Sequence, residues 1–187
     1  MGVSARRGSP LSQEEIRSTA LRMVDEGGVE SLSMRKLAAA LNVNPMSLYH
    51  HVESKEALIG TLCRLAGDEL QLPPDDGSPW QDQLRSLALA YHAMASSHPA
   101  LWVYVHNHPE IVADKQTGLW QVLHRILRAA SVPEPELRRT GDVLHAFVAG
   151  FVFSETKGHL DPDHNQEEID RTFDTAINLI IYGLSGR

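Results

Sequence analysis

Residues 33–55 of the chain, SMRKLAAALNVNPMSLYHHVESK, decide the fold that we expect. Ser33 and Asn44 are favoured N-cap residues, and each precedes a run with apolar residues at helical spacing. Asn42, between the two runs, tolerates a positive φ, and Pro45 suits the first position of a helix. The stretch therefore predicts two short helices joined by a tight turn, a helix-turn-helix geometry that places its second helix in the major groove of DNA.

The second of these predicted helices has two unlike faces. Leu48 and Val52 are its strongly apolar residues and are expected to face inward. Met46, Ser47 and His50 then share the opposite face. This face suits a DNA groove better than a protein core, because serine can bond base edges and methionine can meet a thymine methyl group.

The residues before this stretch are expected to support it. Ser12 and Glu15 form a capping-box pattern at the start of a helix over residues 13–26, which a pair of glycines ends. Residues 1–10 are small and polar with two arginines. We interpret them either as an arm laid along DNA or as a solvated tail.

The rest of the chain also has helical patterns. Ser54 is expected to cap a helix that runs to about residue 70, and residues 71–79, QLPPDDGSP, form a loop. Strand patterns are absent, so the sequence predicts an all-α protein. Further helices are expected over residues 80–97, 99–106, 110–130, 136–157 and 166–184.

The composition is that of an ordinary globular protein, with 42% hydrophobic and 22% charged residues among 187. The net charge of −7 lies entirely beyond residue 60, because residues 1–60 hold seven basic and seven acidic side chains. Such a chain is not expected to bind nucleic acid indiscriminately. The single cysteine, Cys63, excludes an internal disulfide and a cysteine-rich zinc site, and we interpret it as a buried thiol rather than a redox sensor. No membrane span or secretory signal is visible, which makes the cytoplasm the default location.

The segment SMRKLAAALNVNPMSLYHHVESKEALI, residues 33–59, closely resembles the DNA-binding domain of the TetR family of transcriptional regulators. LYHHV followed by SKEAL is its most distinctive part. The resemblance implies about nine helices: a three-helix helix-turn-helix domain at residues 1–56 and a helical ligand-binding and dimerisation domain at residues 57–187. It also implies a homodimer that binds a palindromic double-stranded operator, with repression as the simpler default over activation.

Positions that match the family's motif imply particular DNA contacts. Arg35 resembles a groove-edge or phosphate contact, and Lys55 resembles a backbone anchor, although a solvated lysine is the alternative. Residues 45–47 open the recognition helix, where the family reads bases. The full set of residues expected at the DNA is Arg35, Pro45, Met46, Ser47, Tyr49, His50, His51 and Lys55.

The second part is expected to bind a small hydrophobic or aromatic effector. Its tryptophans, histidines and phenylalanines suit a cavity with a few polar groups, although each of them is alternatively a core or surface residue. The segment HAFVAGFVFSE resembles the family's penultimate, dimer-forming helix, and the last two helices predict either a four-helix dimer interface or an internal pair. The residues expected to line the effector site are His92, Trp102, Tyr104, His106, Trp120, His124, Phe147 and Phe151.

Other functions are less well supported by the sequence. His106 and His108, with His92, His98 and His124, form a candidate metal cluster, but no HExxH spacing or cysteine joins them, so we expect neither a metal nor a cofactor. No phosphate loop, GxSxG motif or paired acid motif indicates an enzyme. A DNA-binding or architectural protein without an effector is the alternative that we retain.

Overall fold

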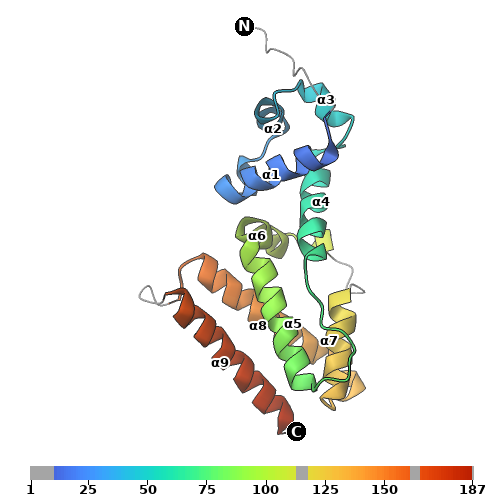
Figure 1. The fold of residues 1–187 in the computed structure, drawn as a ribbon, viewed down its shortest axis with the longest axis vertical. Helices are drawn as coiled ribbons and strands as arrows, with labels where there is room; N and C mark the ends of the chain where they lie inside the picture. Colours follow the sequence, from blue (N-terminus) through green and yellow to red (C-terminus); the bar gives the residue numbers. More distant parts are fainter. Residues whose placement is uncertain (1–10, 113–117, 161–164, 187) are drawn as a thin grey trace. The chain divides into compact units, whose positions relative to one another are not determined.

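The computed structural model describes residues 11–112, 118–160 and 165–186, so the predicted arm at residues 1–10 lies outside it (Figure 1). Across these residues the chain forms nine α-helices and three short 3-10 helices, without a strand. This confirms the all-α fold that the sequence predicts. None of the helices in these ranges is long and apolar enough to cross a membrane.

The helices follow one another along the chain with short connections. The 3-10 helices are η1 (Val29–Ser31), η2 (Pro109–Val112) and η3 (Glu134–Glu136). The α-helices are α1 (Gln13–Gly27), α2 (Met34–Ala40), α3 (Pro45–Tyr49), α4 (Lys55–Asp68), α5 (Trp80–Ser97), α6 (Pro99–Asn107), α7 (Gly118–Ala129), α8 (Leu137–Thr156) and α9 (Gln166–Ser185).

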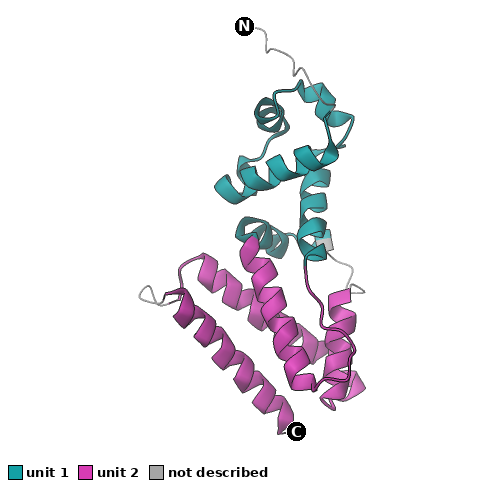
Figure 2. Cartoon of the chain, viewed as in Figure 1, with its two compact units in different colours: residues 1–69, 98–111 teal, residues 70–97, 112–187 magenta. Residues whose placement is uncertain are grey.

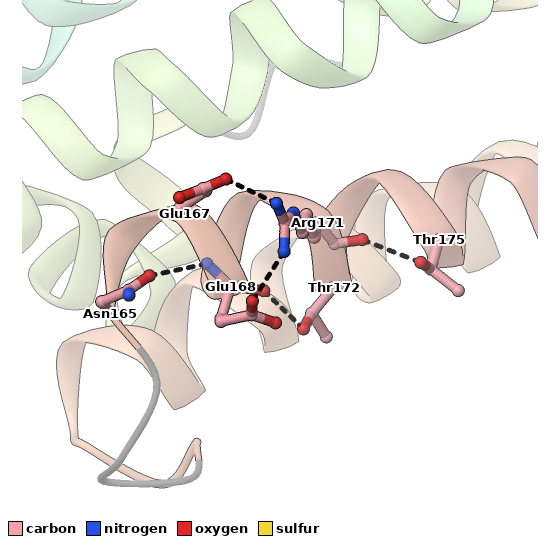
Figure 3. A network of polar contacts seen from close by, with 6 residues as sticks. All are labelled: Asn165, Glu167, Glu168, Arg171, Thr172 and Thr175. Atoms are coloured by element: carbon pink, nitrogen blue, oxygen red, sulfur yellow. Dashed lines mark hydrogen bonds and ion pairs between the residues drawn. The ribbon is translucent and has the colours of Figure 1, made fainter.

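Side-chain caps set where several helices begin. The Ser12 hydroxyl accepts a hydrogen bond from the Glu15 backbone N–H at 3.1 Å, and the Glu15 carboxylate accepts one from the Ser12 N–H, which completes the predicted capping box. Figure 3 shows the start of α9, where the Asn165 side chain accepts from the Glu168 N–H at 3.0 Å. Arg171 then pairs with Glu167 and Glu168, so the first turns of α9 are polar and solvated.

The chain divides into two compact units, which Figure 2 colours separately. Unit 1 comprises residues 1–69 and 98–111, and therefore contains α1 to α4 and α6. Unit 2 comprises residues 70–97 and 112–187, with α5 and α7 to α9. The functional boundary expected near residue 56 stays a prediction, because compactness and function need not divide a chain at the same residue.

Unit 1 has a continuous core of aliphatic side chains. Ile16 of α1, Leu37 of α2 and Leu48 of α3 are fully buried, and Leu101 of α6 joins the same cluster. Cys63 also lies in this core, and burial raises the pKa of its thiol to about 11. The thiol is therefore neutral near pH 7, in line with its interpretation as a core residue.

Unit 2 is built around α5, α7 and α8, with α9 packed against α5 at one side of the unit (Figure 1). Arg125 of α7 fixes the segment before α5, because its Nη2 donates to the backbone oxygens of Pro73 and Pro74 at 2.9 and 3.1 Å. The same nitrogen donates to the side-chain oxygen of Gln83 at 2.9 Å. The apolar core includes Leu84, Leu87, Leu123, Ile126, Leu127, Leu137, Leu144 and Leu184.

The prediction of one helix over residues 110–130 is wrong for the first residues of this range. Residues 109–112 form the 3-10 helix η2, residues 113–117 lie outside the described ranges, and α7 begins only at Gly118. Ile111 packs against the core of unit 1, whereas Leu123 and Ile126 of α7 pack in unit 2. The two apolar groups therefore serve different cores, although their spacing in sequence resembles one helical stripe.

Candidate nucleic-acid interface and effector cavity

The turn between α2 and α3 has the geometry that its sequence predicts. Asn42 adopts a φ of 54°, in the left-handed region that asparagine tolerates. The Val43 N–H then donates to the Ala38 carbonyl at 3.0 Å. The Asn44 side chain accepts from the Met46 N–H at 2.9 Å and caps α3. These local bonds fix the direction of α3 relative to α2.

The outward side of α3 is unusually apolar for a solvated surface. Met46 is 67% exposed and Tyr49 is 49% exposed, while Leu48 between them is fully buried. One short helix thus anchors itself through a single leucine and presents large side chains to solvent. Of the predicted DNA-binding residues, Arg35, Pro45, Met46, Tyr49, His50 and His51 are exposed, and Ser47 and Lys55 are partly exposed.

Arg35 and Lys55 are the cations of this predicted set. Within the described residues neither side chain makes a hydrogen bond or an ion pair with another side chain, so both can meet a ligand without breaking an internal contact. Lys55 opens α4, whose N-cap Ser54 accepts from the Ala57 N–H at 3.1 Å. Backbone N–H and Ser54 hydrogen bonds lower the pKa of the Glu56 carboxyl, so a carboxylate already occupies part of this helix start.

His51 lines a groove together with two arginines that the sequence predictions do not include. An open groove of unit 1 is lined by His51, by Arg17 of α1 and by Arg64 of α4. Arg17 donates to the Gln13 side chain at 2.7 Å, and Arg64 donates to Thr61 at 3.0 Å. Arg17 and Arg64 lie on other helices, α1 and α4, so no local sequence pattern connects them with His51.

Unit 2 contains a small apolar cavity between α5, α7, α8 and α9. Its volume is about 40 Å³, enough for a few water molecules and far below what a typical ligand fills. No lysine, arginine, aspartate or glutamate contributes to its lining. The lining residues are Leu84, Leu87, Ala88, Tyr91, Leu119, Trp120, Leu123, Leu144, His145, Phe147, Val148, Ile177 and Ile180.

A tyrosine–histidine pair supplies the polar edge of this cavity. The Tyr91 hydroxyl lies 3.0 Å from Nδ1 of His145, and the two rings stack with centroids 5.5 Å apart. Burial raises the pKa of the Tyr91 phenol, which therefore stays protonated. The predicted effector residues include neither member of this pair, because the pairing joins helices far apart in the chain.

Two of the residues predicted for the effector site, Trp120 and Phe147, line the cavity. Trp120 packs close to Gly141, where a Cβ would lie only 3.2 Å from its ring. The His124 ring lies 6.1 Å from the Trp120 ring, and its Nε2 is buried without a hydrogen-bond partner among the described residues.

His92 and Phe151 lie in an aromatic cluster of unit 2 and not in the cavity wall. The His92 ring stacks on Phe173 with centroids 4.5 Å apart, and its Nε2 lies 2.8 Å from a carboxylate oxygen of Glu155. Phe151 meets both rings edge to face. These residues join α5, α8 and α9.

The other three predicted effector residues belong to α6, within unit 1. Tyr104 packs against the core of that unit, and its ring lies 4.3 Å from the ring of His108. His106 is exposed and Trp102 is partly exposed. None of these three side chains is among the residues that line the cavity of unit 2.

The histidines considered as a metal cluster are distributed over both units. His92 and His124 lie in unit 2, whereas His98, His106 and His108 lie in unit 1. Across the described ranges, no group of three or more histidine, cysteine or acidic side chains is arranged to hold a metal ion.

The outer faces of α8 and α9 expose apolar side chains in unit 2. On α9, Leu179 is 69% exposed and Tyr182 is 81% exposed. On α8, Val143, Ala146, Gly150 and Phe153 recur at helical spacing and are all exposed. An exposed apolar stripe of this kind marks an interaction surface.

In unit 1, a tight turn joins α2 to the exposed helix α3. This arrangement places the protein in the class of helix-turn-helix proteins. Residues 16–62 match the family described as "Bacterial regulatory proteins, tetR family", and residues 84–180 match "Tetracyclin repressor-like, C-terminal domain". The second match alone spans more than half of the chain. The chain therefore belongs to the TetR family.

Curated relatives cover most of the chain. An HTH-type transcriptional regulator of Saccharopolyspora erythraea is 27% identical over 146 residues, which are 78% of this chain and 61% of that protein. The HTH-type transcriptional repressor DrrR1 of Streptomyces coeruleorubidus is 29% identical over 151 residues, 78% of this chain and 54% of that protein. The chain thus spans less than two thirds of the length of these relatives.

Solved structures share the fold at low sequence identity. ActR of Streptomyces coelicolor, in complex with (S)-DNPA, has a TM-score of 0.69 at 23% identity and covers 95% of this chain and 98% of its own. BioQ with its double-stranded DNA operator has a TM-score of 0.71 at 23% identity, with coverage of 95% and 99%.

Proposed function

We propose that the protein is a transcriptional repressor that binds a palindromic operator as a homodimer and leaves it when a small hydrophobic or aromatic effector binds. The observation that carries the proposal is the outward face of α3. Met46 and Tyr49 are exposed on either side of the fully buried Leu48, on a helix that the Asn44 cap and the preceding turn hold in place. A solvated surface gains nothing from such residues, whereas a DNA groove accommodates them.

The exposed residues of unit 1 divide into two roles. Met46, Ser47 and His50 read base edges, and Pro45 opens the helix that carries them. Arg35 and Lys55, with Tyr49 and His51, hold phosphates and fix the position of α3. Two copies on a dimer would read half-sites about 34–36 Å apart, one turn of DNA.

Dimerisation is assigned to the outer faces of α8 and α9. Their exposed apolar residues, among them Val143 and Tyr182, form the kind of surface that four-helix interfaces bury. Membership of the family supports this assignment, because the match to the C-terminal domain covers α8 and residues 166–180 of α9.

Effector control is assigned to the cavity of unit 2. Ligand-sized molecules need several hundred Å³, so binding has to displace walls of the 40 Å³ cavity. His145 and Ile177 line it from α8 and α9, which also carry the proposed dimer contacts. Movement of these helices would change the separation of the two recognition helices. A coupling free energy of about 1–3 kcal/mol is typical of such control.

The test is an electrophoretic shift with the DNA upstream of the protein's own gene. A sequence-specific, salt-sensitive complex formed by a dimer is expected. Effector control further requires that a compound from a screen of hydrophobic and aromatic molecules releases the DNA from a protein that stays dimeric. A specific complex that no such compound releases would favour the effector-free DNA-binding protein.

A further inference from the structure

The cavity of unit 2 is lined mostly by apolar side chains and has one polar edge, and this combination restricts its ligand. No lysine, arginine, aspartate or glutamate contributes to the lining. Burying an unpaired charge in such surroundings costs far more than burying a neutral group. Phosphorylated metabolites and carboxylate ligands therefore find no lysine or arginine to pair with in this cavity.

Tyr91 and His145 form that polar edge. The phenol of Tyr91 is protonated, and its oxygen lies 3.0 Å from Nδ1 of His145. In the hydrogen bond between these two atoms, one atom donates and the other accepts, and the tautomer of His145 decides which does so. The pair can therefore open to admit a group that accepts from one member and donates to the other.

A hydroxyl group matches this pair better than other neutral groups. Its oxygen accepts from the donor and its hydrogen is given to the acceptor, so both buried atoms stay satisfied in either tautomer of His145. A carbonyl oxygen only accepts, so it can pair with the donor of the two but not with the acceptor, and a hydrocarbon can pair with neither.

The walls beside this edge are aromatic. The Trp120 ring lies 5.5 Å from the His145 ring, and the Phe147 ring stacks on Phe173 with centroids 5.8 Å apart. Offset and edge-to-face contacts with such rings favour a flat aromatic ligand over an aliphatic one of equal size.

We propose that the cavity binds a neutral, planar aromatic molecule with a hydroxyl group at one edge, and that Tyr91 and His145 recognise this hydroxyl. The inference rests on the proposed function, because it names the effector class of the same site. Tyr91 of α5 and His145 of α8 would provide the specificity for the hydroxyl group, and the apolar walls would provide the affinity for the aromatic ring.

The test compares three two-ring probes in calorimetric titrations and thermal melts of the full chain. 2-Naphthol carries the hydroxyl, 2-methylnaphthalene replaces it with a methyl group, and 2-naphthoate carries a charge. Wild-type protein is expected to bind 2-naphthol about tenfold more tightly than 2-methylnaphthalene, the value of one to two net hydrogen bonds. Binding of 2-naphthoate is expected to be weakest.

Tyr91→Phe removes one oxygen and is expected to reduce the preference for 2-naphthol to less than about twofold. In Tyr91→Phe/His145→Phe, which removes both members of the pair, the preference is expected to disappear while 2-methylnaphthalene still binds. Tyr104→Phe makes the same change in unit 1 and should retain the wild-type preference.

The inference is overturned if wild type binds 2-naphthol and 2-methylnaphthalene equally, if Tyr91→Phe keeps the preference, if 2-naphthoate binds best, or if none of the probes binds. Operator binding is measured on the same preparation without a probe. Specific operator binding without a preference for 2-naphthol contradicts only the ligand class, whereas absence of specific operator binding contradicts the proposed function itself.

Discussion

Nδ1 of His98 lies 3.2 Å from both carboxylate oxygens of Asp25, which ties the residue before α6 to α1. Leu101, one turn into α6, is buried in the same core as Leu48 of the recognition helix. A segment that follows α5 of unit 2 in sequence therefore belongs to the unit that carries the helix-turn-helix. Its packing makes α6 part of the support of α3.

This packing predicts a large effect of Leu101→Ala on the stability of unit 1. Removing a fully buried leucine should cost about 2–5 kcal/mol of unfolding free energy, since the cavity collapses only in part. Urea unfolding followed by far-UV circular dichroism measures it. Val103→Ala, at a less buried position of the same helix, should cost clearly less. Equal small losses in both variants would contradict the assignment of α6 to this core.

Lys55 is expected to contact a phosphate once in each half-site. Lys55→Gln should weaken binding to all DNA sequences alike and reduce the slope of log K against log salt by about two for the dimer. Arg128→Gln removes one positive charge in unit 2, where Arg128 pairs with Glu134, and should leave the slope unchanged. Fluorescence anisotropy at several salt concentrations separates them. An unchanged slope in Lys55→Gln would support the solvated lysine.

The outer face of α9 is expected to be buried in the dimer. Leu179→Glu places a charge at an exposed apolar position of this face and should shift the protein from dimer to monomer in sedimentation experiments. Leu89→Glu makes the same change at an exposed position of α5, outside the stripe, and should stay dimeric. Retention of the dimer in both variants would exclude this face as the interface.

Arg125 is expected to hold residues 71–79 against unit 2. Arg125→Gln removes the hydrogen bonds to the Pro73 and Pro74 carbonyls and should lower the unfolding free energy by about 1–3 kcal/mol. It should also speed proteolytic cleavage in this segment, because the freed backbone becomes accessible. Arg128→Gln, three residues further along α7, should have no effect on cleavage. Cleavage at the wild-type rate would show that other contacts fix the segment.

Much of unit 1 was predictable because its determinants are local. Capping residues such as Ser12 and Asn44 act within three positions, and Asn42 marks the turn by its own tolerance of a positive φ. The buried Leu48 follows from helical spacing alone. These signals do not depend on how distant segments pack.

The cavity was harder to predict because its determinants are contacts between distant helices. His145 opens the apolar segment HAFVAGFVFSE and Tyr91 lies 54 residues before it, so only the packing of α5 on α8 makes them a pair. The apolar pattern of α6 likewise does not indicate which of the two cores the helix packs against. For this reason the sequence predicts Trp102 and Tyr104 at the effector site, although α6 belongs to unit 1. The same holds for Ile111, which the sequence predicts in the helix over residues 110–130 but which packs against the core of unit 1.

The central claim is that the exposed face of α3 reads a DNA sequence. The most direct measurement is an anisotropy titration of the protein against an operator duplex from its upstream region and against a scrambled duplex, at physiological salt. The account predicts binding to the operator about 10³-fold or more tighter than to the scrambled duplex, and loss of most of this ratio in Met46→Ala/Ser47→Ala. Equal affinity for the two duplexes, or a ratio unchanged in that variant, would contradict it.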